Sequence, residues 1–134
     1  MDLIRKEAST TCISGTKVGN RQKKGESHVP KYLLGIDNGG TVAKAALFAL
    51  DGTEKAVASR KTAMTSPQPG HTERDMDELW QGTADAIREV LAKSQVSPGD
   101  IAGLATAGHG NGLYLVDKAG RPVRNGIVST DSRA

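Results

Sequence analysis

Residues 32–48 read YLLGIDNGGTVAKAALF, and this stretch decides the fold of the chain. Residues 32–36 are apolar and of strand length, residues 38–40 (Asn-Gly-Gly) are a strong turn signal, and residues 42–50 are apolar again. The pattern predicts a β-hairpin. It matches neither a P-loop, which needs Gly-x-x-x-x-Gly-Lys-Ser/Thr before a helix, nor the Gly-x-Gly-x-x-Gly turn of a dinucleotide-binding fold.

The predicted turn gathers groups that suit phosphate and magnesium. Gly39 and Gly40 have no Cβ, so backbone N–H groups can approach phosphate oxygens closely, and Thr41 can add a hydroxyl donor. Asp37 comes just before the turn, and proteins commonly hold Mg²⁺ by one or two carboxylates together with water and phosphate oxygens. The stretch alone fits an ordinary hairpin turn equally well, so the rest of the chain must decide.

The remaining periodicity indicates an α/β domain. Residues 55–62 alternate roughly between polar and apolar and predict a third antiparallel strand. Asp75 to Ser94 predicts a helix, since Asp75 with Glu78 forms a capping-box-like start. Its apolar stripe, which we expect to face the core, consists of Met76, Leu79, Trp80, Thr83, Ile87 and Leu91.

The last third of the chain predicts one more strand and a second hairpin. Residues 101–107 are short, small and apolar like a buried strand, and residues 108–112 (GHGNG) form a glycine-rich loop after it. Residues 113–116 and 123–128 read as a hairpin-like pair around a turn at 117–120. Strand, helix and strand in this order place the chain in the α/β class.

Four segments in this order resemble the FGGY family of carbohydrate kinases, within the sugar kinase, actin and Hsp70 superfamily. They are residues 32–48, 66–80 (SPQPGHTERDMDELW), 107–117 (AGHGNGLYLVD) and 125–134 (NGIVSTDSRA). Among subfamilies, the pattern is most similar to the ketopentose kinases, such as those for L-xylulose. The resemblance implies an α/β fold of ribonuclease-H-like type, of which residues 32–134 are the amino-terminal part of the first domain.

The resemblance also implies the chemistry: ATP-dependent phosphorylation of a sugar hydroxyl in the complete protein, with ATP and Mg²⁺ as cofactors. It places the general-base Asp and the adenosine-binding motifs beyond residue 134, so we expect this chain alone to be inactive and to contain no catalytic residue. The implied partner is a sugar, and a homo-oligomer is compatible with the complete protein. A polyol kinase for erythritol or glycerol and a non-catalytic binding module are the alternatives.

Candidate site residues follow from the matching motifs. For cofactor phosphates they are Gly39, Gly40, Thr41 and Lys44; for the metal, Asp37; for the sugar, Asn111, Gly110, His109 and Asp131. Four of them have a plainer alternative: Asn111 with Gly112 can simply make a turn, His109 can be a loop residue with one backbone hydrogen bond, Asp131 can form a surface pair with Arg133, and Lys44 can be a solvated strand residue. Ser129 stands where the family commonly has Trp, which puts the shape of the sugar pocket in question.

Composition argues against other partners. The net charge is +3 and the isoelectric point is about 9.1, but the basic excess lies before the hairpin, and only 3% of residues are aromatic, so the chain lacks stacking platforms for nucleic acid. Cys12 is the only cysteine, and no apolar run reaches the roughly 18 residues of a membrane helix. We expect a soluble, cytoplasmic protein with no membrane partner, whose residues 1–31 are a disordered basic extension.

Overall fold

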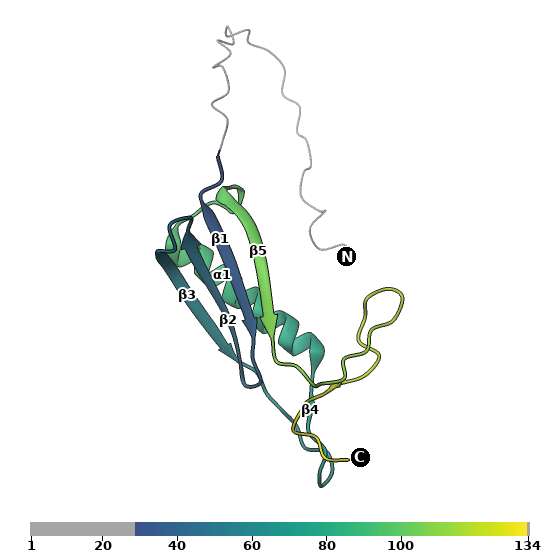
Figure 1. Cartoon of the computed structure of the whole chain (residues 1–134). Coiled ribbons are helices and arrows are strands. Elements are labelled where there is room, and N and C mark those ends of the chain that lie inside the picture. The colour runs from purple at the N-terminus through teal and green to yellow at the C-terminus, as the bar shows by residue number, and fades with distance from the viewer. Residues whose placement is uncertain (1–28, 134) are drawn as a thin grey trace, which may run out of the picture.

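A four-stranded sheet forms the centre of the computed structural model, which describes residues 29–133. Its strands are β1 (Tyr32–Asn38), β2 (Val42–Ala49), β3 (Glu54–Lys61) and β5 (Ile101–Gly108), in the order β3-β2-β1-β5 (Figure 1). The first three strands are antiparallel, and β5 lies parallel to β1. The predicted hairpin, third strand and α/β class are therefore confirmed. Most of the predicted disordered extension, residues 1–28, lies outside the described residues.

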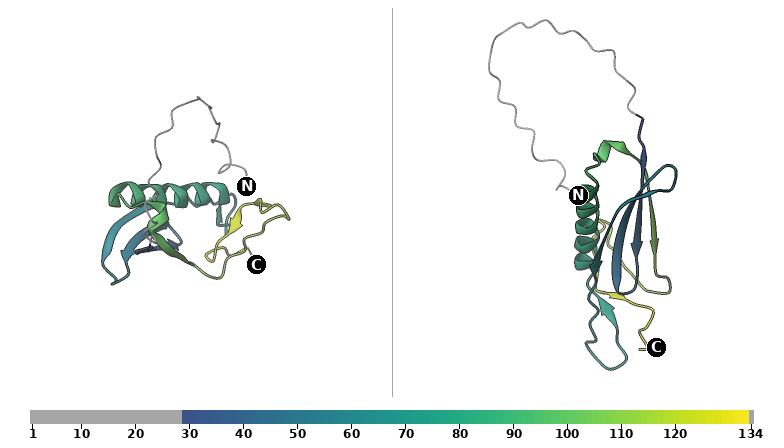
Figure 2. Two further views of the ribbon diagram at one scale, coloured as in Figure 1. Left: turned by 90° about the horizontal axis from the view of Figure 1, so that it is seen from above. Right: turned by 90° about the vertical axis from the view of Figure 1, so that its left-hand side faces the viewer.

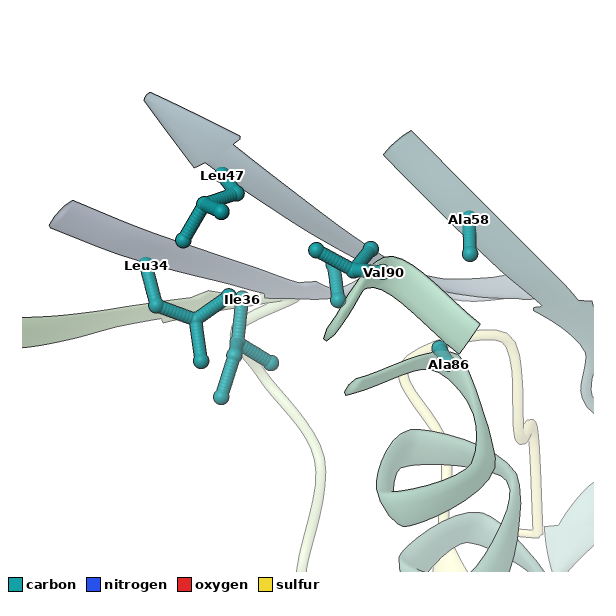
Figure 3. Packing of buried hydrophobic residues seen from close by; sticks show 7 residues of the cluster. Leu34, Ile36, Leu47, Ala58, Ala86 and Val90 are labelled. Atoms are coloured by element: carbon teal, nitrogen blue, oxygen red, sulfur yellow. The ribbon is translucent and has the colours of Figure 1, made fainter. Parts of the chain in front are cut away.

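Helix α1 (Met76–Ser94) covers one face of this sheet (Figure 2). It begins as predicted, because the Asp75 side chain accepts hydrogen bonds from the N–H groups of Asp77 and Glu78. It ends at Gln95, whose φ of 55° is left-handed. Figure 3 shows the core between helix and sheet, and its buried members are Leu34, Ile36, Ala45, Leu47, Ala58, Ala86 and Val90.

Trp80 corrects the predicted core. Its side chain is 73% exposed, whereas Thr83 on the next turn of α1 is buried and donates a hydrogen bond to the Asn38 side chain at the end of β1. The two residues of the predicted stripe therefore differ: Thr83 contacts the end of β1, whereas the Trp80 side chain faces solvent. The stripe pattern predicted the right helix but not which of its residues are covered.

Strand β5 is the second correction. The strand is present, but it is mostly exposed rather than buried, and Leu104 at its centre is 57% exposed. The reason is its position, because β5 is an edge strand of the sheet and pairs on one side with β1. An apolar run predicts a strand that is suited to burial, but the neighbours that would bury it are a property of the tertiary structure.

A small two-stranded sheet lies beyond the end of the larger one. It pairs β4 (Glu73–Arg74) with β6 (Gly126–Ile127), and Leu113 exchanges backbone hydrogen bonds with Ile127. The predicted pairing of residues 113–116 with 123–128 is thus confirmed as bridges around a turn, while β4 and the 3-10 helix η1 (Pro98–Asp100) were not predicted. Within the described part of the chain, no helix has the length and apolar character to cross a membrane.

Candidate functional site

The two candidate loops meet at one end of the four-stranded sheet. Strands β1 and β5 are parallel, and their last residues, Asn38 and Gly108, are direct partners. Both strands therefore end at the same edge of the sheet. The phosphate turn, defined as residues 38–41, follows β1 there, and the sugar loop, defined as residues 108–112, follows β5 (Figure 1). Chain topology therefore brings together two motifs that lie about 70 residues apart in the sequence.

Backbone and side-chain hydrogen bonds fix the phosphate turn from several directions. The Gly39 N–H donates to the Val42 carbonyl at 3.0 Å and closes the hairpin. The Thr62 N–H donates to the Thr41 carbonyl at 3.0 Å, and Thr83 Oγ1 donates to Asn38 Oδ1 at 2.9 Å. The turn is therefore held by β3's end and by α1 as well as by its own strands.

Arg74 lies directly beneath the phosphate turn. Its Nη1 donates to the Gly39 carbonyl at 3.3 Å, and its Nη2 donates to the Gly40 carbonyl. The side chain is only 1% exposed, and its Nε is buried without a hydrogen-bond partner. Among residues 29–133, this guanidinium binds carbonyl oxygens and pairs with no carboxylate.

Asp37 and Lys44 lie on the sheet face opposite α1. They are direct partners across β1 and β2, and both are exposed. With Ala105 and Ala107 of β5 they line a shallow groove on that face. The charged end of this groove adjoins the phosphate turn.

The residues near the turn fit a magnesium ion held mainly by phosphate and water. Among the described residues, no three His, Cys, Asp or Glu side chains group together as a protein-only metal site would need. Asp37 offers one exposed carboxylate, which is the number Mg²⁺ often takes when substrate phosphates and water complete its coordination. Asp37 is therefore the residue that would contact the ion, directly or through water.

His109 connects the sugar loop to the phosphate turn. Its backbone nitrogen lies 3.2 Å and its Nδ1 3.3 Å from the Asn38 carbonyl oxygen, and its Nε2 is hydrogen-bonded to the Tyr114 hydroxyl. Because a carbonyl oxygen only accepts, Nδ1 is the donor in its contact with Asn38. This pattern matches the plainer prediction of a backbone-bonded loop histidine, and it adds Tyr114, to which the sequence analysis assigned no role.

Tyr114 occupies a slot that only glycine leaves open. A Cβ on Gly112 would lie 2.5 Å from the Tyr114 ring, and one on Gly126 would clash with it as well. Burial raises the pKa of the Tyr114 hydroxyl, and the nearby charge of Arg74 opposes this shift. Tyr114 therefore fills the space beside Gly112 and Gly126, with its ring edge-on to that of His109 at a centroid distance of 5.7 Å.

Asn111 and Gly110 are exposed at the tip of the sugar loop. Asn111 has a φ of 63°, a left-handed conformation that Asn adopts more readily than most residues, so its turn role is real. Its amide is also accessible, which a sugar contact requires. The predicted contact therefore stays a prediction that the conformation of Asn111 accommodates.

Asp131 is not an ordinary surface pair. Its side chain is 4% exposed and accepts from the Thr72 N–H at 2.6 Å and from Arg133 Nε at 2.7 Å. Arg133 also binds Glu73 at 2.9 Å, and Arg124 binds Glu73 at 2.5 Å. This acid cluster (Glu73, Arg124, Asp131 and Arg133) joins residues 72–73 to residues 124–133. No hydrogen bond of the described chain brings Asp131 to the sugar loop.

The acid cluster predicts a pH-dependent stability. Hydrogen bonding to Arg133 lowers the pKa of both Asp131 and Glu73. A carboxyl whose folded pKa lies below its unfolded value stabilises the fold above the unfolded value, about 4 for these groups, and loses this contribution as the pH falls toward the folded pKa. We expect the unfolding temperature, followed by circular dichroism, to be nearly flat from about pH 7 to 5 and to fall below about pH 4.

Asp131→Asn should weaken this acid dependence, because an amide has no proton to gain. Asp85→Asn is the matched control, since Asp85 forms an exposed pair with Arg88 on α1. The prediction fails if Asp131→Asn and wild type lose the same amount of stability between pH 5 and 3.

Three residues of the site escaped the sequence analysis: Arg74, Thr83 and Tyr114. Arg74 stands in a quoted motif and Thr83 in the helical stripe, but neither position carries a local signal for a contact with a turn some 35 to 45 residues earlier. A polar Thr within an apolar stripe was the one available hint. These contacts are set by the packing of α1 and β4 against the end of the hairpin.

The hairpin, third strand, helix and parallel fourth strand form the amino-terminal part of an actin-like α/β fold. The profile of the FGGY family of carbohydrate kinases, N-terminal domain, matches residues 32–134. The chain therefore belongs to the FGGY family of carbohydrate kinases.

Relatives and solved structures agree with this assignment. A protein described as "Probable L-xylulose kinase" from Pasteurella multocida is 46% identical over 103 residues, covering 77% of this chain and 21% of the relative. The L-xylulose/3-keto-L-gulonate kinase of Escherichia coli is 44% identical over 104 residues, covering 78% and 21%. A xylulose kinase structure from Rhodospirillum rubrum matches with a TM-score of 0.70 and 30% identity, covering 77% and 21%. The chain thus spans about a fifth of the length of these proteins.

Proposed function

We propose that residues 32–134 are the phosphate- and sugar-contacting part of an ATP-dependent kinase for a ketopentose such as L-xylulose. The observation that carries the proposal is the shared end of β1 and β5, where the phosphate turn and the sugar loop contact each other through Asn38 and His109. Phosphoryl transfer needs its two substrates side by side, and this edge offers groups suited to each. Two of the relatives are described as L-xylulose kinases, which supports the choice of sugar.

The chemistry of each candidate residue suits a different part of the proposed reaction. ATP supplies the phosphoryl group, and Mg²⁺ neutralises charge on its phosphates. The N–H groups of the phosphate turn and the Thr41 hydroxyl would bind phosphate oxygens, with Lys44 adding positive charge and Asp37 holding the ion. The exposed amide of Asn111 would bind a sugar hydroxyl, and Gly110 and His109 would shape the loop around it.

A hybrid kinase tests the proposal. Residues 32–134 would replace the matching segment of the E. coli L-xylulose/3-keto-L-gulonate kinase, which restores the remaining four fifths of a kinase chain. We expect this hybrid to release ADP with L-xylulose, and the 134-residue chain alone to release none above the sugar-free rate. A folded hybrid without activity would contradict the proposal.

A polyol is the second candidate substrate, because a glycerol kinase from Citrifermentans bemidjiense is 36% identical over 104 residues. A matched hybrid that carries the glycerol kinase segment shows how far this segment determines substrate choice. For each hybrid we would compare the turnover of glycerol with that of L-xylulose. A hybrid with residues 32–134 that prefers glycerol, as the control hybrid does, would favour the polyol.

Asn111→Ala in the hybrid kinase should mainly raise the KM for sugar. Losing one hydrogen bond to a substrate hydroxyl costs about 1–1.5 kcal/mol, which corresponds to roughly a tenfold higher KM with a smaller change in kcat. Gln81→Ala, an exposed amide on α1, is the control and should change neither constant. Steady-state kinetics would exclude the contact if the KM for sugar of the Asn111→Ala hybrid stayed within twofold of the parent.

A further inference from the structure

Arg74 is a buried cation whose bonding is unusual for a protein interior. Burying a guanidinium is costly unless a carboxylate pairs with it or its donors are satisfied. Arg74 is 1% exposed, its Nε has no hydrogen-bond partner, and its two Nη atoms bind the carbonyl oxygens of Gly39 and Gly40. The acid cluster lies on the same segment, yet Glu73 pairs with Arg124 and Arg133 instead.

The directions of the Gly39 and Gly40 carbonyls also fix the directions of the N–H groups in the same peptide units. In a trans peptide the C=O and N–H bonds point in opposite directions, and the described chain has no cis peptide bond. Because the Gly39 and Gly40 carbonyls point toward Arg74, the N–H groups of Gly40 and Thr41, which belong to the same two peptide units, point away from it. The Gly39 N–H closes the hairpin on Val42, so it is not one of this pair.

The two glycines make the phosphate turn flexible, so a contact from outside the turn is needed to hold its conformation. Gly40 has no atom within 4 Å of where its Cβ would lie, so side-chain packing does not restrain it. Glycine also has the widest choice of backbone conformations. Within residues 29–133, Arg74 hydrogen-bonds to the Gly39 and Gly40 carbonyls from outside the hairpin. These hydrogen bonds can therefore hold the turn in one conformation.

We propose that Arg74 is a positioning residue of the phosphate turn, which binds the Gly39 and Gly40 carbonyls from inside and so directs the Gly40 and Thr41 N–H groups outward as an anion-binding pair. The described hydrogen-bond partners of Arg74 are carbonyl oxygens, and a polyphosphate bound on the outer side of the turn would bring negative charge toward it. The inference rests on the proposed function for its ligand, while the positioning itself is independent of any ligand.

The first measurement therefore uses no ligand. Backbone ¹⁵N relaxation on the 134-residue chain should give order parameters near 0.85 for the Gly40 and Thr41 N–H groups, and values below about 0.6 in Arg74→Met. Core amides such as that of Leu47 report whether the variant is folded. Arg88→Met, an exposed arginine on α1, is the matched control and should leave the turn unchanged. Equal order parameters in wild type and folded Arg74→Met would overturn the proposal.

Two conservative variants separate the charge of Arg74 from its shape. Arg74→Lys keeps the charge, but an ammonium group lacks the planar fork that binds two carbonyls, and Arg74→Gln keeps donors without charge. We expect mobile Gly40 and Thr41 amides in both. If Arg74→Met does not fold, these two variants decide the question, and a Lys or Gln variant with rigid amides overturns the positioning role.

The second measurement titrates inorganic tripolyphosphate and follows the same amides. We expect shifts at Gly40 and Thr41 in wild type, and at least tenfold weaker binding in Arg74→Lys, despite its unchanged charge. Wild-type affinity in Arg74→Lys with mobile amides would overturn positioning in favour of charge alone. A rigid wild-type turn that depends on Arg74 but binds no tripolyphosphate would support the positioning role and contradict the proposed function.

Discussion

Asp37→Asn should lower the kcat of the hybrid kinase by about 100-fold or more, with a much smaller change in the KM for sugar. The substitution keeps the size of the side chain and removes its negative charge, which lies on the exposed groove face beside the phosphate turn. A neutral amide binds Mg²⁺ far less well than a carboxylate does, so charge on the transferring phosphoryl group would be less well stabilised. The concentration of Mg²⁺ that gives half-maximal rate should rise as well.

Asp51→Asn is the matched control for this experiment. Asp51 belongs to the same hairpin system but lies in the turn between β2 and β3, where its carboxylate accepts from the Thr53 N–H. It should leave kcat and the Mg²⁺ dependence unchanged. An Asp37→Asn hybrid with kcat within twofold of the parent, and with an unchanged Mg²⁺ requirement, would remove Asp37 from the site.

The parts of the fold that the sequence predicted are those with local causes. Asn38-Gly39-Gly40 bends the chain because of its own backbone preferences, and Asp75 caps α1 through contacts within one helical turn. The burial of a residue could not be predicted from its apolar character alone, because it depends on which element of the tertiary structure covers that residue. Trp80 and the strand β5 were predicted to lie in the core because their residues are apolar, but both are exposed in the structure, β5 at the open edge of the sheet.

The candidate site divides in the same way. The phosphate turn and the sugar loop could be proposed from glycine, carboxylate and amide patterns, since each lies within a few consecutive residues. Arg74 and Tyr114 could not, because an arginine and a tyrosine in unremarkable positions gain their roles from contacts with Gly40 and His109 across the fold. Asp131 was proposed as a sugar contact, which stays a prediction, while its bonds to Thr72 and Arg133, which join two segments of the chain, could not be foreseen from the sequence.

Leu47→Ala should cost about 2–5 kcal/mol of the free energy of unfolding, the range for a buried leucine replaced by alanine. Leu47 lies on β2 with no exposed surface and packs in the core between the sheet and α1 (Figure 3). Removing its side chain leaves a cavity, because the core there includes Ala45, Ala58 and Ala86, which are too small to fill it. Since small domains are stable by about 5–15 kcal/mol, this single change should remove much of the stability.

Leu104→Ala makes the comparison decisive, because it removes the same atoms from the same sheet. Leu104 on β5 is 57% exposed, so its replacement should change the free energy of unfolding by no more than about 0.5 kcal/mol. Urea unfolding of the 134-residue chain, followed by circular dichroism, measures both variants against wild type. Equal losses would mean that β5 is buried in solution, as its apolar sequence first suggested, and that the chain covers this edge in a way the described residues do not. A large loss for Leu47→Ala alone would instead confirm that the hydrophobic core lies between α1 and the sheet, and that Leu104 on the edge strand β5 is exposed.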